Sequence, residues 1–362
     1  MFSSRRRFLR TIGKISSATA MGLALPLRAA AYSQQITVNR DKSLVGPDGD
    51  CTSLIQSAID KLPPQGGEVV VGPGEYLIDA VKSVRLRNGV SLTLEPGATL
   101  RAIPTDAGSY SVVRIYGATG ARVHGGNIVG ERNQHLGTKG EWGMGIDIRG
   151  SHDVIIQNVI VSECWGDGVY VGSLGDKDSG ACSAITLRGV VARGNRRQGA
   201  SIVSCRGALV EQCTFVDTKG TAPAAGIDLE PDAGLTVQDV QIVDCTTNNN
   251  QGDGIHLLAV APGARVLNCT VTGGKSCGNN RYGISLVGST GCRIEGTELT
   301  DNAGYAVFVR STSADCVISP GKIARNMGRA AAFKTMLGIA TNDIMVEPGA
   351  AAIRVDLSKA HG

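Results

Sequence analysis

Aromatic residues and long apolar runs are scarce in this chain. Its 362 residues include only 5 Phe, 7 Tyr and 2 Trp, against 49 Gly. This composition predicts β-structure with many turns. After the N-terminal region, no segment approaches the roughly 18 apolar residues of a membrane-spanning helix, so no membrane span is expected.

Zinc-binding cysteine patterns and basic stripes are also missing from the sequence. There is no Cys-x-x-Cys pair and no His/Cys spacing typical of a zinc site. The formal net charge is +4, but six basic residues lie in the first 31 residues, which contain no acid, so the remainder carries about −2. Without a basic face and interleaved aromatic residues, the chain is not expected to bind nucleic acid.

The N-terminal segment has the features of an export signal. The stretch Ser4-Arg5-Arg6-Arg7-Phe8-Leu9 is followed by a weakly apolar run to Leu27 and by Ala29-Ala30-Ala31. This order resembles a twin-arginine signal peptide with its cleavage site. The resemblance implies that residues 1–31 are removed, that the twin-arginine export machinery is a partner, and that the mature protein is periplasmic or secreted.

Ten cysteines would ordinarily suggest disulfides in an exported protein. Cys213, Cys245 and Cys269, however, recur in similar local strings, which favours small buried residues. The resemblance to a twin-arginine substrate implies that the protein folds before export, in a reducing compartment. This also argues against structural disulfides. Cys182 and Cys205 precede successive expected strands and are the first pair to test.

A repeat of 23 to 31 residues organises the chain from residue 144 onward. Each copy has apolar residues one and three positions after a small central residue. The centres are Gly145, Gly168, Gly199, Gly226, Gly254, Gly283 and Ala306. Such a repeat cannot bury its apolar side alone, so successive copies must stack around a shared core. The sequence therefore predicts an all-β fold, a single-domain right-handed parallel β-helix.

The start of the mature chain resembles the N-terminal cap of the pectate-lyase-like β-helix superfamily. The similar stretches are Asp50 to Ile59, Gly66-Gly67-Glu68 and Pro73-Gly74-Glu75. The resemblance implies that a short amphipathic helix over Ser53 to Leu62 closes one end of the solenoid. We expect one domain over residues 32–362, with an N-terminal cap at about 45–80, coils at about 85–325 and a C-terminal cap at about 326–362.

Stacking turns one repeat position into a row of outward side chains. Two residues after the centres stand Asp147, Tyr170, Ser201, Asp228, His256, Ser285 and Phe308, about 4.8 Å apart per coil. Flanking positions add Arg149, Asp167, Arg197, Gln198, Glu230 and Asp253. Polar and titratable residues are concentrated between Asp147 and His256, and the C-terminal coils are expected to be bland. Trp165 or Tyr170 would offer an aromatic surface to a sugar.

The stretch from Gly226 to Asp232 contains three carboxylates. On a strand, Ile227 and Leu229 would point into the core, whereas Asp228 and Glu230 would point to solvent about 6.6 Å apart. The candidate catalytic residues are Asp228, Glu230, Asp253, His256 and Arg197. The candidate substrate-binding residues are Asp147, Arg149, Trp165, Asp167, Tyr170, Gln198, Ser201 and Asp232.

Three functions fit these residues. Glycoside hydrolysis with inversion uses two carboxyl groups about 6.5–9.5 Å apart, a separation that Asp228 and Glu230 would meet. A lyase or epimerase acting on a uronate polymer would use Tyr170, Arg197 or His256 as the base. The third function is non-catalytic carbohydrate binding. Hydrolysis requires no cofactor, whereas a lyase could use Ca²⁺ held by Asp228, Glu230, Asp232 and Asp253.

The superfamily resemblance implies a polysaccharide substrate, but it does not select the reaction. The superfamily includes lyases, glycoside hydrolases, epimerases and phage tailspikes. The chain lacks the Asn-Thr-Asp, Asp-Asp, Gly-His-Gly and Arg-Ile-Lys series of its pectin hydrolases. Of the Tyr-Gly-Phe-Asp-Pro-His motif of its uronan epimerases, the chain shares only the placement of Asp and Pro. We favour hydrolysis, because the expected groove is richer in carboxylates than in lysines.

Overall fold

The computed structural model of this chain describes residues 34–39, 49–326 and 343–360. Contacts divide the chain into Met1–Ala31 and Tyr32–Gly362, and every described residue belongs to the second unit. The expected export signal lies outside the described residues. Within the described part, no helix has the length and apolar character needed to cross a membrane.

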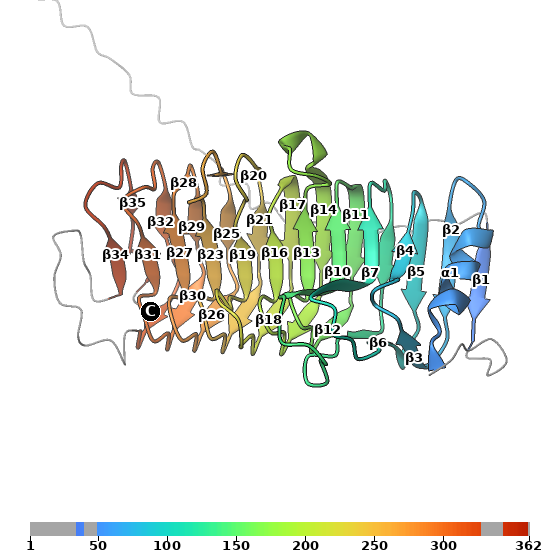
Figure 1. Ribbon diagram of the computed structural model, residues 1–362. Helices are drawn as coiled ribbons and strands as arrows, with labels where there is room; N and C mark the ends of the chain where they lie inside the picture. Colours follow the sequence, from blue (N-terminus) through green and yellow to red (C-terminus); the bar gives the residue numbers. More distant parts are fainter. Residues whose placement is uncertain (1–33, 40–48, 327–342, 361–362) are drawn as a thin grey trace, which may run out of the picture. The chain divides into compact units, whose positions relative to one another are not determined.

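Residues Tyr32–Gly362 form a solenoid of three parallel sheets, which Figure 1 shows as successive strands along one axis. Each coil passes through all three sheets, so neighbours in one sheet come from successive coils. Sheet 1 consists of β1 (Gln35–Val38), β2 (Gly67–Val71), β5 (Val90–Leu94), β8 (Arg122–His124), β11 (His152–Gln157), β14 (Cys182–Arg188), β17 (Cys205–Glu211), β20 (Thr236–Gln238), β21 (Gln241–Val243), β24 (Arg265–Leu267), β25 (Thr270–Thr272), β28 (Ser289–Thr290), β29 (Arg293–Glu295), β32 (Val317–Ser319) and β35 (Arg354–Val355).

Sheets 2 and 3 contain the remaining strands. Sheet 2, which carries the predicted row, consists of β4 (Val84–Leu86), β7 (Ser109–Tyr116), β10 (Trp142–Arg149), β13 (Val169–Gly172), β16 (Ala200–Ile202), β19 (Ile227–Leu229), β23 (Ile255–Leu258), β27 (Ile284–Val287), β31 (Val307–Val309) and β34 (Ile344–Val346). Sheet 3 consists of β3 (Gly74–Ile78), β6 (Ala98–Ala102), β9 (Asn127–Val129), β12 (Ile160–Ser162), β15 (Val191–Arg193), β18 (Thr214–Val216), β22 (Thr246–Asn248), β26 (Lys275–Cys277), β30 (Glu298–Thr300) and β33 (Ile323–Ala324). A 3₁₀ turn, η3 (Asp178–Gly180), lies between β13 and β14.

The glycine of each repeat stands where the chain turns into sheet 2. At Gly226, a Cβ atom would lie only 2.7 Å from the carbonyl oxygen of Gly254 and 2.8 Å from the side-chain Nδ2 of Asn250. The next residues, Ile227 and Leu229, are fully buried in the core, as predicted. Close approach of neighbouring coils therefore explains why the repeat centres on glycine.

Buried asparagines connect the C-terminal coils beside sheet 3. The Asn250 side-chain amide donates to Oδ1 of Asn279 at 3.0 Å, and Asn279 donates to Oδ1 of Asn302 at 2.9 Å. Asn302 continues the series to Asn326 at 2.9 Å. Each amide thereby satisfies a buried polar group of the next coil, which holds successive coils in one register.

Within the described residues, the single α-helix is α1 (Thr52–Lys61), which contacts β1, β2, β3 and β4 at the N-terminal end of the solenoid. Its Ile55 and Ile59 side chains are fully buried. The helix predicted over Ser53 to Leu62 is thus present. Two strands also pair beyond the expected coil region, since β34 pairs with β31 and β35 pairs with β32. The limits of the two caps stay predictions.

The described cysteines mostly line the core. Cys182 and Cys205 are in register on β14 and β17, yet both are buried thiols rather than a disulfide. Burial raises the pKa of the Cys182 thiol to about 11, so it is protonated at neutral pH. These two residues act as small core side chains.

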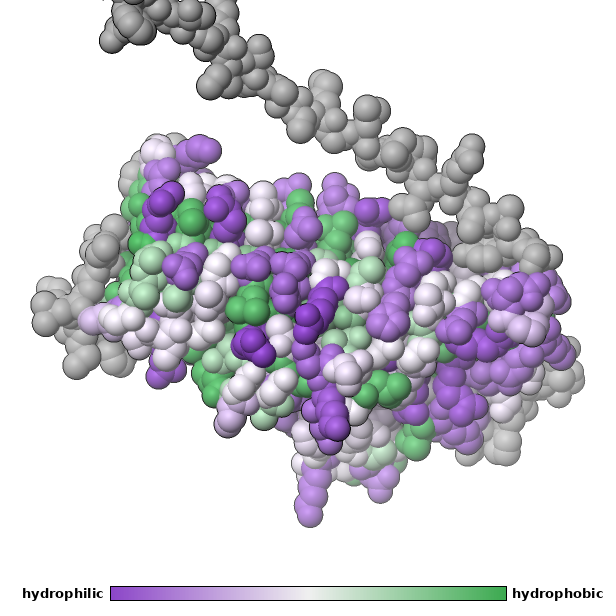
Figure 2. Space-filling model, turned by 90° about the horizontal axis from the view of Figure 1, so that it is seen from above, coloured by the Kyte–Doolittle hydropathy of each residue, from purple (hydrophilic) through white to green (hydrophobic). Residues whose placement is uncertain are grey.

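Figure 2 shows hydrophilic residues across much of one face, with apolar residues in small groups between them. Among the described residues, the exposed large apolar side chains are Val81, Leu136, Trp142, Leu174 and Val260. Trp142 is the single aromatic residue of this set and begins a strand of sheet 2.

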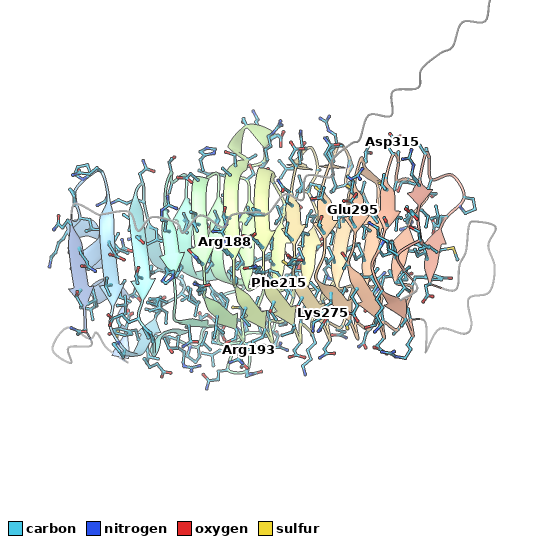
Figure 3. The ribbon with its side chains drawn as sticks, turned by 180° about the vertical axis from the view of Figure 1, so that it is seen from behind. Arg188, Arg193, Phe215, Lys275, Glu295 and Asp315 are labelled. Carbon is cyan, nitrogen blue, oxygen red and sulfur yellow. The ribbon has the colours of Figure 1, made fainter. Side chains whose placement is uncertain are left out.

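The buried Phe215 allows a test of the shared core. Figure 3 labels Phe215 on β18 and Lys275 on β26, both in sheet 3, but Phe215 is fully buried and Lys275 is exposed. We expect Phe215→Ala to lower the free energy of unfolding by about 3–5 kcal/mol, because it leaves a cavity between coils. Lys275→Ala should change it by less than about 0.5 kcal/mol. Urea unfolding of both variants measures the difference, and equal effects would contradict the assigned core.

Candidate active site

The predicted row of outward side chains is confirmed in sheet 2. Parallel pairing aligns Asp147, Tyr170, Ser201, Asp228, His256, Ser285 and Phe308 on successive strands. The expected exposure of Asp228 is wrong, because its side chain is only 1% exposed. Side chains of the neighbouring coils cover it, so a position outside the core is not the same as a position in solvent.

Asp228 is the centre of a buried polar cluster. Gln198 donates from Nε2 to Oδ2 of Asp228 at 2.6 Å, and its Oε1 accepts from the Ala225 backbone at 2.7 Å. His256 Nδ1 lies 3.4 Å from Oδ1 of Asp228, an ion-pair distance without the geometry of a well-formed hydrogen bond. Burial lowers the pKa of His256, but pairing with Asp228 outweighs burial and the net shift is upward. Gln198 and His256 thus hold Asp228 from two sides.

Glu230 is the more accessible carboxyl group of this cluster. Asp228 acts on it through its charge and through a side-chain hydrogen-bonding interaction, so the two carboxyl groups lie near each other. Burial, followed by the charge of Asp228 and this hydrogen bond, raises the pKa of Glu230 to about 8. Glu230 is therefore protonated at neutral pH.

A second carboxylate, Asp167, is held by residues of the following coil. Nη1 of Arg197 lies 3.0 Å from Oδ2 of Asp167, and the Ser201 hydroxyl donates to the same oxygen at 2.7 Å. Burial raises the pKa of Asp167 to about 6, although Arg197 and Ser201 favour its ionised form. Asp228 and Glu230 also act on Arg197 and contribute to its raised pKa.

Asp253 repeats the arrangement of Asp167 further along the solenoid. Its Oδ2 accepts from the Ser285 hydroxyl at 2.5 Å, and its Oδ1 accepts from the Tyr282 backbone at 3.1 Å. Arg281 Nε lies 3.7 Å from Oδ1. The carboxylate is thus bonded to the following coil, and we interpret it as a bracing group whose charge raises the pKa of His256.

A calcium site from Asp228, Glu230, Asp232 and Asp253 is not formed. No three His, Cys, Asp or Glu side chains of the described residues converge in a way that could hold a metal ion. The oxygens of Asp253 bind Ser285 and Tyr282, while the exposed Asp232 instead acts on Tyr170. The acids alternate in sequence, but their side chains do not meet around one point.

Asp147 and Arg149 form a separate group on the N-terminal side. Arg149 Nε lies 2.9 Å from Oδ1 of Asp147, and the Tyr116 hydroxyl donates to Oδ2 at 2.5 Å. The Arg149 guanidinium also lies 4.6 Å from the ring centre of Tyr170, over one face of that ring. Tyr170 therefore has at most one face for a sugar, and these residues stay candidates for binding.

Trp165 cannot serve as the expected sugar platform. The His135 ring is stacked on it at 3.8 Å between centres, and the Arg196 guanidinium lies 3.7 Å from its centre. Two groups so close to one ring centre must occupy opposite faces, so both faces of the indole are covered. His135 comes from the segment between β9 and β10, which the repeat alignment does not include.

Two further groups were missed by the repeat alignment. Glu131 accepts from the Tyr110 hydroxyl and binds His135, with 2.9 Å between Oε1 and Nδ1.

In the C-terminal coils, stacked aromatic rings replace the expected bland surface. Tyr282 stacks on Phe308 with 4.6 Å between ring centres and lies 6.1 Å from Tyr305. In the sequence, the only signal that could have identified these positions is that aromatic residues are rare in this chain.

The groups around Asp228 have the properties of an acid–base site. Glu230 holds a proton at neutral pH, and Arg197 provides a fixed positive charge beside it. Buried Asp228 and its partners leave Glu230 as the carboxyl group that reaches the surface. Separation of pKa values between neighbouring carboxyl groups is a property of acid–base sites.

Comparison with known families identifies the class of protein. The model of the right-handed β-helix region matches residues 83–237 and 142–279, which together cover more than half of the chain. The chain therefore belongs to the right-handed β-helix family. The predicted handedness and fold class are confirmed.

Among individual proteins, the chain is similar to two proteins of Bacillus subtilis strain 168. It is 31% identical over 205 residues to the uncharacterized protein YclG, covering 50% of this chain and 35% of YclG. It is also 31% identical over 187 residues to the prophage-derived uncharacterized protein YorA, covering 45% of this chain and 32% of YorA. The matches thus span about a third of the length of these relatives.

Solved structures share the fold at low sequence identity. The A-module of the mannuronan C-5 epimerase AlgE4 of Azotobacter vinelandii has a TM-score of 0.51 and 15% identity, over 91% of this chain and 99% of the module. The polygalacturonase of Erwinia carotovora has a TM-score of 0.50 and 16% identity, over 92% of this chain and 97% of the enzyme. The tailspike gp49 of Acinetobacter baumannii bacteriophage Fri1 has a TM-score of 0.51 and 15% identity, over 90% of this chain and 64% of the tailspike. Such likeness shows the fold alone.

The raised pKa of Glu230 predicts how stability depends on pH. The ordinary value is 4.5 and the folded value is about 8, so between them the folded state retains a proton that the unfolded state has lost. Stability should therefore fall as the pH rises across this window. We expect Glu230→Gln to flatten the fall in melting temperature, because Gln cannot ionise. Glu75→Gln, an exposed site on sheet 3, is the control, and parallel curves for wild type and Glu230→Gln would refute the assignment.

Proposed function

We propose that this protein is an exported polysaccharide-degrading enzyme in which Glu230 donates a proton to the departing glycosidic oxygen. The observation that carries the proposal is a partly exposed carboxyl group with a pKa of about 8, beside a buried carboxylate and an arginine. A general acid works best when its pKa lies near the working pH. Export rests on the N-terminal resemblance, which places the enzyme where extracellular polymers occur.

The neighbours of Glu230 support this role without touching the glycosidic bond. Asp228 is buried and accepts from Gln198, so it provides a fixed negative charge that keeps the proton on Glu230. His256 braces the opposite side of Asp228. We propose Gln198 and His256 as positioning residues, and Arg197 as the group that stabilises negative charge developing on the substrate.

The distribution of charge on sheet 2 favours an anionic polymer as substrate. Three buried carboxylates on this face each pair with a more exposed arginine. The exposed fractions are 30% against 4% for Arg149 and Asp147, 15% against 0% for Arg197 and Asp167, and 52% against 1% for Arg281 and Asp253. Guanidinium groups thus reach the surface above acids, and they bind carboxylate groups in two-point geometry. A uronate-containing chain has such carboxylates.

Hydrolysis is the first candidate reaction. Asp228 is only 1% exposed and cannot reach an attacking water, so Asp228 and Glu230 do not serve as an inverting pair in this proposal. Asp167 is fully buried and bonded to Arg197 and Ser201, so it holds Arg197 in place, and the proton of the attacking water passes to solvent in this proposal. The bases expected for a lyase are less suited, since upward pKa shifts keep Tyr170 and Arg197 protonated at neutral pH and the pKa of His256 is also raised.

β-Elimination from a uronate polymer is the second candidate reaction, and epimerisation would share its first step. The exposed arginines favour it, because elimination requires neutralisation of the uronate carboxylate. The mannuronan epimerase and the polygalacturonase with the same fold act, by their names, on mannuronan and on a galacturonan. Both polymers are therefore suitable first substrates.

Substitution of Glu230 tests the proposed acid. We expect Glu230→Gln to lower kcat on polygalacturonate or alginate by about 10²–10⁴, because the amide has no acidic proton to transfer. Asp228→Asn should lower kcat as well and shift the upper limb of its pH profile downward, because the pKa of Glu230 loses the contribution of Asp228. Reducing-end release measures both variants.

The matched control for these variants is Glu211→Gln. Glu211 is a half-buried carboxylate that pairs with Arg188 on sheet 1, away from the proposed site. Full activity of Glu230→Gln would sink the assignment of the acid. Ultraviolet absorbance of the products separates the two reactions, since unsaturated uronates absorb and hydrolysis products do not. New absorbance would show that the reaction is elimination rather than hydrolysis.

Metal removal tests the role assigned to the arginines. Because no carboxylate cluster of the described residues forms a cation site, we expect EDTA to leave activity unchanged, whereas Arg197→Lys should reduce it about tenfold or more. Lysine keeps the charge but not the planar donor geometry. Loss of activity on chelation, restored by Ca²⁺, would contradict this assignment.

A further inference from the structure

Trp142 is a partly exposed indole at the beginning of β10. Its exposed fraction is 48%, whereas the second tryptophan, Trp165, lies between His135 and Arg196. The residues before it, Thr138 and Lys139, are polar and exposed. A broad aromatic surface among polar side chains suits a sugar ring, which presents C–H groups on its face and hydroxyl groups at its edge.

The backbone around Trp142 is fixed rather than free to adapt. The Trp142 N–H donates to the carbonyl oxygen of Gly108 at 3.0 Å. At Gly143, a Cβ atom would lie 2.4 Å from the Tyr110 ring and 2.8 Å from Cβ of Trp165. This crowding presses the strand against the next coil, so the indole is attached to a rigid segment. Rigid attachment lowers the entropy lost on binding.

Trp142 also lies close to the proposed site. Its neighbour Glu141 has Oε1 3.8 Å from Nε of Arg197, the residue that binds Asp167. The backbone N–H of Gly166 donates to the carbonyl oxygen of Gly143 at 2.7 Å, and the backbone N–H of Arg197 donates to that of Gly166 at 3.1 Å. Gly143 and Arg197 therefore lie two coils apart. Two coils correspond to about 10 Å along the solenoid axis. Trp142 lies six residues before Ile148, which is in register with Leu229 through β13 and β16, so a polymer that reaches both Trp142 and Glu230 crosses the face obliquely past Arg197.

We propose that Trp142 forms a binding subsite that stacks on a pyranose ring of the polymer, on the N-terminal side of the acidic cluster. This inference rests on the proposed function. The repeat alignment assigned no role to Trp142. Trp165, which the sequence favoured for this role, has both faces covered. The subsite contributes affinity for a long substrate and takes no part in bond cleavage.

Tryptophan fluorescence provides a test that is independent of turnover. In a Trp165→Phe variant, Trp142 is the single tryptophan, because the chain contains only two. We expect polygalacturonate or alginate to shift its emission to shorter wavelength and to reduce quenching by acrylamide about twofold or more. If Trp165→Phe does not fold, acrylamide quenching of the wild type reports on Trp142, since the covered Trp165 is shielded in both states.

Kinetics with substrates of two lengths test the same subsite. Trp142→Ala should raise KM about tenfold for the polymer and leave kcat nearly unchanged, whereas Trp142→Phe should retain most of the affinity. A short oligosaccharide that does not reach Trp142 should show equal KM with wild type and Trp142→Ala. Leu136→Ala is the control, because Leu136 is 71% exposed in the preceding segment and has no role in the proposal.

The outcomes separate this inference from the proposed function. If a polymer protects Trp142 but is not cleaved, the subsite is retained and the catalytic proposal fails. If a polymer is cleaved while Trp142 stays fully quenchable and Trp142→Ala has normal KM, the subsite is wrong. If neither polymer protects Trp142 or is cleaved, both proposals are overturned for uronate polymers. Equal effects of Leu136→Ala and Trp142→Ala would show a general change of the segment and reject the subsite.

Discussion

Backbone pairing between successive coils is the constraint on which this structure depends. Each residue of a strand is in register with its equivalent one coil later, as in the series from Asp147 through Asp228 to Phe308. The apolar positions form a continuous core, and Gly226 and its equivalents permit the close approach at the corner. Because register is shared by all coils, residues about 30 positions apart become neighbours, and a site can be assembled from many repeats.

The same stacking determines the electrostatics of the face. Close packing of coils removes water from Asp167 and Asp228, so each requires partners from an adjacent coil: Arg197 and Ser201 for the first, Gln198 and His256 for the second. The carboxyl group at the edge, Glu230, is partly buried beside a negative charge and retains its proton. Bracing of the buried acids and the raised pKa of Glu230 therefore have one physical origin.

The fold does not select the reaction on this face. An epimerase, a polygalacturonase and a phage tailspike share the β-helix with this chain at identities of 15–16%. The stacked sheets provide a row of positions, and the side chains at those positions determine the chemistry. In this chain, buried acids beneath more exposed arginines, Glu230 at their edge and the exposed indole of Trp142 are the features that distinguish the face.

The sequence by itself determined the parallel β-helix, the capping helix and the order of the outward row, because a repeat with apolar residues beside a glycine allows one way of stacking. The tertiary structure decided what that order means. It buried Asp228, brought Glu230 near it, turned Asp253 toward Ser285 and covered both faces of Trp165. These outcomes depend on side-chain length and on segments between the repeats, such as the one that carries His135, and repeat spacing contains no information about either.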